Sequence, residues 1–133
     1  MKTKTIRQQV TFKGATPHGL YEWLMDSKKH SRFTGQKASI SRKVKGKFKA
    51  GDGWIDGVNL ELVRDKLIVQ GWRGNDDDWP KGYYSVVRFR FTKTKDGTRL
   101  DFLHTGVPVS ACEGIRDGWR ECYWEPLKRQ LQK

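Results

Sequence analysis

The feature that most constrains the fold is a long amphipathic stretch at the C-terminal end of the sequence, from Val107 to Lys133. At about 100° per residue, most of its apolar side chains fall on one side of a helix, and two leucines drift to the edge of that side. These residues are Cys112, Ile115, Trp119, Cys122, Tyr123, Pro126, Leu127 and Leu131. The spacing predicts one helix of about two dozen residues with a single apolar side.

Four residues of this stretch do not fit a regular helix. Pro126 removes one backbone hydrogen bond inside it, which predicts a kink. Gly114 and Gly118 each cost about 1 kcal/mol relative to alanine, so we expect another element to approach the helix closely there. Trp124 falls about 180° from Ile115, off the apolar side. It either lies flat on its own helix or contacts a partner.

The length of 133 residues suits one domain, residues 1–133, with a core of its own. The N-terminal sequence MKTKTIRQQV lacks the apolar run of a signal peptide, and no run of about 18 apolar residues could span a membrane. Cys112 and Cys122 are about 15 Å apart along the predicted helix, beyond the roughly 7 Å that a disulfide allows. We therefore expect reduced thiols in a cytoplasmic, monomeric protein.

Positive charge is concentrated between Lys28 and Lys49, where nine residues are Lys or Arg and none is Asp or Glu. The formal net charge of the whole chain is +12. Such a segment attracts an acidic protein, a phosphate backbone or an anionic membrane surface through long-range steering. The alternative is a solvated surface that keeps the protein soluble.

The rest of the sequence predicts mainly strands. Alternating apolar residues indicate a strand over residues 4–12, and Thr16 then caps a helix that ends near Met25. Ser27 caps a second short helix, which Gly35 closes. The following strands, separated by turns, are KASIS, VKGKFKA, WIDGVNLELV, KLIVQGWRG, the stretch around Val87, Phe89 and Phe91, and TRLDFLHTG.

Short connections force these strands to pair antiparallel, which makes the fold class α+β in the order β-α-α-β6-α. One curved sheet of seven strands needs cover on its apolar side, and the C-terminal helix is the only element long enough to give it. The inward-facing candidates are Ile6, Val10, Phe12, Phe48, Leu60, Leu62, Val87, Phe89, Phe91, Leu100 and Phe102.

Five segments resemble the C-terminal domain of the activator of heat-shock protein 90 ATPase. They are KGKFKAGDG at 45–53, LVRDKLIVQGWR at 62–73, WPKGYYS at 79–85, GVP at 106–108 and GWRECYWEPLK at 118–128. The resemblance implies the SRPBCC or START-like superfamily and its helix-grip fold, also called the birch pollen allergen fold. In that fold a long C-terminal helix lies over a cavity. The eukaryotic co-chaperone has two domains in series, and only the second resembles this sequence.

The residues that could take part in catalysis or bind a metal are scattered along the sequence. His18, His30 and His104 fall in three different elements, and no His or Cys pair has ligand spacing, so we expect no metal. Asp101 and His104 have opposite parity on one strand and should face apart, which argues against an acid/base pair. Cys112 near the helix start is typical of a small core residue, and a reactive thiol is the alternative. We expect a protein that is not an enzyme and needs no cofactor.

Three kinds of binding remain. In the first, the basic segment, with Lys43, Lys45 and Lys47, and an exposed Trp79 or Trp124 meet the acidic surface of a heat-shock protein 90 chaperone. In the second, a small hydrophobic or lipid-like ligand occupies the space between the sheet and the helix, and the candidate lining residues are Trp72, Phe89, Phe102, Trp119 and Tyr123. In the third, which we rank last, basic residues interleaved with Phe33 and Phe48 grip nucleic acid.

Overall fold

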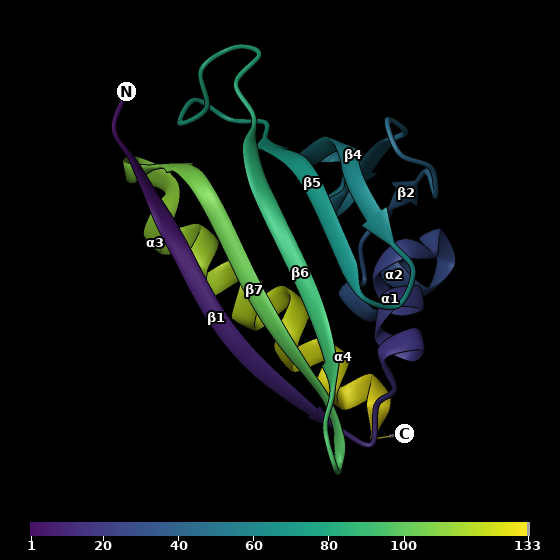
Figure 1. The fold of residues 1–133 in the computed structure, drawn as a ribbon. Coiled ribbons are helices and arrows are strands. Elements are labelled where there is room, and N and C mark those ends of the chain that lie inside the picture. The colour runs from purple at the N-terminus through teal and green to yellow at the C-terminus, as the bar shows by residue number, and fades with distance from the viewer. Residues whose placement is uncertain (133) are drawn as a thin grey trace.

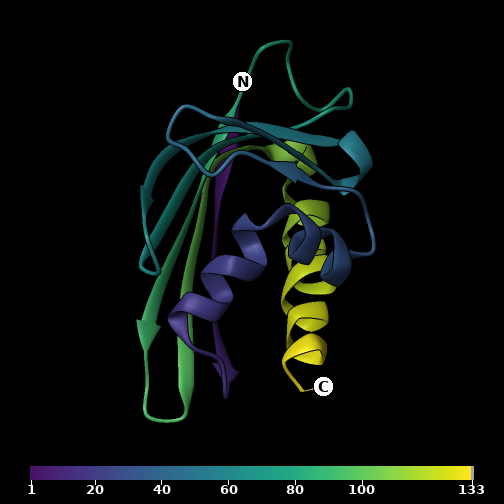
Figure 2. The ribbon, with the colours of Figure 1, turned by 90° about the vertical axis from the view of Figure 1, so that its right-hand side faces the viewer.

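A seven-stranded antiparallel sheet curves around the helices in the computed structural model, which describes residues 1–132. The strand order is β1-β7-β6-β5-β4-β3-β2. The elements are β1 (Thr3–Lys13), α1 (Pro17–Met25), α2 (Ser27–Thr34), β2 (Ser39–Ile40), β3 (Lys47–Ala50), the 3-10 turn η1 (Gly51–Gly53), β4 (Ile55–Val63), β5 (Leu67–Gly74), β6 (Ser85–Lys93), β7 (Gly97–Pro108), α3 (Val109–Gly118), the π-helical segment η2 (Trp119–Trp124) and α4 (Glu125–Leu131). The long C-terminal helix and the shorter helices α1 and α2 lie in the hollow of the sheet (Figures 1 and 2). The predicted α+β fold class and strand count are confirmed.

Strand alternation places the core as predicted for most positions. In β6, Val87, Phe89 and Phe91 are buried and the residues between them are exposed. Leu60 is the exception, because it was expected inside and is 48% exposed. The pairing of β4 with β5 shifts register between Asn59 and Glu61, so Leu60 is an extra residue in a bulge. A one-residue shift reverses the side to which a side chain points.

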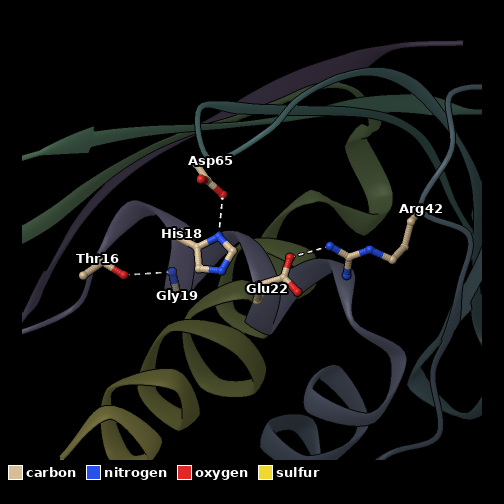
Figure 3. Close-up of polar contacts among 6 residues, drawn as sticks. All are labelled: Thr16, His18, Gly19, Glu22, Arg42 and Asp65. Atoms are coloured by element: carbon tan, nitrogen blue, oxygen red, sulfur yellow. Dashed lines mark hydrogen bonds and ion pairs between the residues drawn. The ribbon is translucent and has the colours of Figure 1, made fainter.

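Helix α1 is fixed to the sheet by side chains at its exposed surface, as Figure 3 shows. The Thr16 hydroxyl accepts a hydrogen bond from the Gly19 N–H at 2.9 Å, which confirms the predicted cap. His18 contacts Asp65 in the β4–β5 turn at 2.9 Å. Glu22 pairs with Arg42, which belongs to the basic segment. The cap of α2 is Asp26 rather than Ser27, because the Asp26 carboxylate accepts from the Lys29 N–H.

The C-terminal helix differs from the prediction in two ways. Val107 and Pro108 finish strand β7, so the helix begins at Val109. Its middle, Trp119–Trp124, is π-helical, and the chain continues as α4 with Pro126 in its first turn. A proline cannot donate to the preceding turn, and a stretch with the wider i→i+5 pattern accommodates the missing bond. The irregularity predicted from Pro126 therefore precedes the proline as a π-helical segment.

Candidate functional site

Trp124 lies inside the molecule and is only 3% exposed. Its indole N–H donates to the Gln8 side-chain oxygen at 2.7 Å, and its ring packs 5.2 Å from that of Phe102. The expectation that Trp124 lies off the apolar side, flat on its own helix or against a partner, is therefore wrong. In the π-helical segment each backbone hydrogen bond spans five residues instead of four. Trp124 therefore lies on the same side of the helix as Trp119 and faces the sheet.

This inward tryptophan occupies space that was predicted for a ligand, beside Phe89 and Phe102. The rings of Phe89 and Phe102 pack against each other and against Trp124 and Trp119. The void beside Phe89 is about 20 Å³, room for no more than one water. Phe89 and Phe102 are buried in the core, and neither lines the open cavity between the sheet and the helix, where they were predicted to lie.

An open cavity of about 420 Å³ lies instead toward the N-terminal half of the long helix. Gly114 and Gly118 line it, and no atom of another element in residues 1–132 lies within 4 Å of the position that a Cβ would take at either glycine. Close approach of a neighbouring element, expected from the sequence, is therefore not the reason for these glycines. Their missing side chains leave room in the cavity.

Aromatic and polar residues together line the cavity. Three of the five predicted ligand residues line it, namely Trp72, Trp119 and Tyr123. The lining residues that sequence reasoning did not identify are Thr34, Gln36, Gly51, Trp54, Ile55, Asp76, Asp78, Ser110, Ala111, Gly114, Ile115, Gly118 and Cys122. A volume of this size falls within the range of small-molecule sites.

His104 packs against the cavity-lining rings of Trp72 and Trp119 and is fully buried in a polar network. The Trp119 indole N–H donates to its Nδ1 at 3.1 Å, so the proton of the neutral ring lies on Nε2. Nε2 then donates to the Ser85 hydroxyl at 2.7 Å, and that hydroxyl donates to the Trp72 carbonyl oxygen at 2.7 Å. Burial lowers the pKa of His104 to about 3. Because Nε2 is a donor here, it cannot take a proton from Ser85, and this Ser–His pair is not an activated nucleophile.

A second buried histidine supports Tyr123. The Nδ1 of His30 contacts the Leu24 carbonyl oxygen at 3.0 Å and must carry the proton, so its Nε2 accepts from the Tyr123 hydroxyl at 2.9 Å. Burial lowers the pKa of His30 and raises that of Tyr123. Both groups stay neutral near pH 7, and the hydrogen bond fixes the Tyr123 ring at the cavity wall.

The remaining candidates for chemistry are separated from one another. Asp101 accepts a hydrogen bond from Gln9 at 2.8 Å, which lowers its pKa, while His104 on the same strand is buried in the core. The predicted separation of this pair is confirmed. Cys112 is buried and forms no disulfide, as expected of a core residue. Among residues 1–132, no three His, Cys, Asp or Glu side chains gather closely enough to hold a metal ion.

Trp79, predicted as an exposed partner contact, is 3% exposed, so that part of the prediction is wrong. Its ring packs 5.6 Å from Trp72. The guanidinium of Arg73 donates to the carbonyl oxygens of Trp79, Pro80 and Tyr83. These contacts fix the loop between β5 and β6, which projects at the top of Figure 1 and carries Asp76 and Asp78.

The basic segment forms an exposed surface at the β2–β3 end of the sheet. Lys43, Lys45 and Lys47 are all exposed, as predicted. Asn59, which sequence reasoning missed, is fully buried and anchors the loop that carries them. Its amide nitrogen donates to the carbonyl oxygens of Ser41 and Lys43 at 2.7 and 3.0 Å. Nothing in the sequence marked Asn59 as buried, because the alternation that placed Leu60 and Leu62 inside puts Asn59 on the opposite side of the strand.

Comparison with known proteins identifies relatives of nearly the whole chain. The family described as Activator of Hsp90 ATPase homolog 1-like protein matches residues 14–132. The Activator of 90 kDa heat shock protein ATPase homolog of Dictyostelium discoideum is 31% identical over 127 residues, covering 95% of this chain and 32% of that protein. Homolog 1 of Homo sapiens is 30% identical over 114 residues, covering 86% and 33%. The chain thus spans about a third of the length of these curated relatives.

A solved structure supports the same fold. The crystal structure of an HSP90 activator from Plasmodium falciparum superposes with a TM-score of 0.85 at 24% identity, covering 98% of this chain and 96% of that one. Likeness at this identity concerns the fold alone. Within residues 1–132, none of the helices combines the length and apolar character that crossing a bilayer requires.

Proposed function

The chain belongs to the family of Activator of Hsp90 ATPase homolog 1-like proteins, and from this premise we propose that it is a non-catalytic protein that binds a heat-shock protein 90 chaperone. The observation that carries the proposal is family membership over residues 14–132 together with the exposed lysines 43, 45 and 47. A positive surface of this kind accelerates encounter with an acidic partner. A cytoplasmic location is part of the proposal and is compatible with two cysteines that form no disulfide.

Absence of catalysis is part of the proposal. The Ser85–His104 pair has the wrong donor direction for a nucleophile and its base. The Tyr123 hydroxyl keeps its proton because burial raises its pKa. The aromatic surroundings of these groups suit recognition rather than proton transfer.

The test is equilibrium binding of the chain to purified chaperone at low and at high salt. The triple variant Lys43→Glu, Lys45→Glu, Lys47→Glu should bind at least about tenfold more weakly at low salt, and wild-type binding should weaken as salt rises. The matched control is Lys13→Glu, Lys93→Glu, Lys95→Glu, which changes the same charge near the β6–β7 hairpin at the bottom of Figure 1. Equal loss in both triple variants, or no binding by the wild type, contradicts the proposal.

A second candidate function is the binding of a small ligand, which the cavity of about 420 Å³ favours. A ligand in that cavity would contact Trp72, Trp119 and Tyr123. The test is native mass spectrometry of the purified protein, followed by thermal unfolding with the molecule that is released. An added mass and a raised melting temperature are expected. A protein that carries no ligand and responds to none contradicts this function.

A further inference from the structure

The walls of the cavity present a row of aromatic rings. The ring of Trp54 lies 5.9 Å from that of Trp72, Trp72 lies 5.7 Å from Trp119, and Trp119 lies 4.7 Å from Tyr123. All four residues line the cavity. The faces of such rings carry negative potential and attract cations, with tryptophan the strongest.

The charged residues that line the cavity are acidic, whereas the molecule as a whole is strongly basic. The chain contains 27 Lys and Arg residues and 15 Asp and Glu. The cavity lining nevertheless contains Asp76 and Asp78 and no Lys or Arg. Within residues 1–132 neither carboxylate forms an ion pair, and one oxygen of Asp76 accepts from the Asp78 backbone N–H. Two carboxylates thus stand at the mouth without a cationic partner in the described chain.

The loop that carries these carboxylates is held in place before any ligand arrives. Trp79 is buried one residue beyond Asp78, and Arg73 binds three carbonyl oxygens at 79, 80 and 83. In the same cavity, Gly114 and Gly118 leave the helix surface open to an apolar group. The cavity therefore combines a fixed acidic mouth with an apolar, aromatic interior.

We propose that the cavity binds a hydrophobic organic cation, a long-chain or aromatic amine or quaternary ammonium compound. This rests on the second proposed function, ligand binding in the same cavity, and gives the chemical class of the ligand. The ammonium group lies at the mouth near Asp76 and Asp78, and the apolar body lies against the rings. A fatty acid of the same size would bring its carboxylate close to two carboxylates, so it is disfavoured.

The test compares three probes of equal chain length below their aggregation concentrations, namely decyltrimethylammonium, decanol and decanoate. Isothermal titration calorimetry at low salt should give binding of the cation about tenfold or more tighter than the alcohol, with decanoate weakest. Non-specific attraction cannot explain tighter binding of the cation, because the net charge of +12 would attract decanoate instead. Equal or tighter binding of decanol or decanoate overturns the charge preference while leaving ligand binding in place. Binding of none of the three overturns both.

Amino-acid substitutions test which residues cause the preference for the cation. Asp76→Asn with Asp78→Asn should remove most of the preference for the cation while decanol binding stays within about twofold. The matched control is Asp77→Asn, which alters an exposed carboxylate between them that does not line the cavity and should keep the preference. Gly118→Leu should fill the cavity and abolish binding of every probe, with circular dichroism confirming the fold. Retention of the cation preference in the double variant, or of binding in Gly118→Leu with the fold intact, overturns the assignment.

Discussion

The indole rings of Trp119 and Trp124 stack 5.7 Å apart with 17° between their planes, although the two residues are five positions apart in the sequence. In a regular α-helix the side chains of two residues that are five positions apart point about 140° away from each other around the helix axis, so both rings could not face the sheet. The π-helical segment brings them to one side. The second ring then fills the space above Phe89 and Phe102, and the open cavity is confined to the part of the helix that carries two glycines.

Replacing Trp124 with alanine should lower the free energy of unfolding by about 3–5 kcal/mol, because a buried ring and its bond to Gln8 are lost. Chemical denaturation followed by circular dichroism measures the change. Arg120→Ala, an exposed position in the same segment, serves as the control and should change it by less than about 0.5 kcal/mol. A Trp124→Ala protein as stable as the wild type would mean that this ring is not buried in solution.

The order of the elements along the chain, the antiparallel pairing and the helix against the apolar side of the sheet follow from short connections and alternating apolar residues, and the sequence predicted them. The pairing of β1 with β7 was not predicted, because these two strands lie far apart in the sequence. Trp124 was placed wrongly because periodicity assumes 3.6 residues per turn throughout a helix. Leu60 was placed wrongly because a bulge cannot be seen in an alternating pattern. Phe89 and Phe102 were wrongly assigned to the cavity for the same reason as Trp124 was misplaced, since its ring packs against both of them.

Acid should destabilise the protein through His104. Its pKa is about 3 in the folded chain and about 6.5 when unfolded, so between these values the unfolded chain binds the extra proton. Stability is therefore complete above about pH 6.5 and falls as pH drops toward 3. His104→Gln, which does not titrate, should reduce the slope by up to about 1.4 kcal/mol per pH unit between pH 6 and 4.

Urea denaturation at several pH values measures this slope. His30 has a lowered pKa too, so part of the slope should survive in His104→Gln. His18, which is exposed and lies beside Asp65, provides the control variant His18→Gln. A slope in His104→Gln equal to that of the wild type would exclude the buried neutral ring that the structure shows.

Tyr123→Phe should destabilise the fold by about 1–3 kcal/mol, because it leaves the buried Nε2 of His30 without a donor. Tyr84→Phe is the matched control, since its hydroxyl donates to Asp56 at the surface and its loss should cost well under about 1 kcal/mol. Thermal unfolding of both variants at pH 7 makes the comparison. Equal changes in the two melting temperatures would contradict the buried hydrogen bond.

Asn59→Leu should cost about 1–3 kcal/mol, because the carbonyl oxygens of Ser41 and Lys43 and the amide of Gln70 lose a buried partner. Leu60→Ala, at the exposed neighbouring position in the bulge, should change stability by less than about 0.5 kcal/mol. Denaturant titration of the two variants is the measurement. A larger loss for Leu60→Ala than for Asn59→Leu would show that the register of β4 differs from the one described.

Chaperone recognition through the basic segment is the central claim, and hydrogen exchange of the chain with and without saturating heat-shock protein 90 tests it most directly. Amides over residues 41–50 should become protected in the complex, because the loop and strand that carry Lys43, Lys45 and Lys47 would be covered. The β6–β7 hairpin over residues 93–98 should exchange as in the free chain. Unchanged exchange over residues 41–50, or protection confined to the hairpin, would contradict the account.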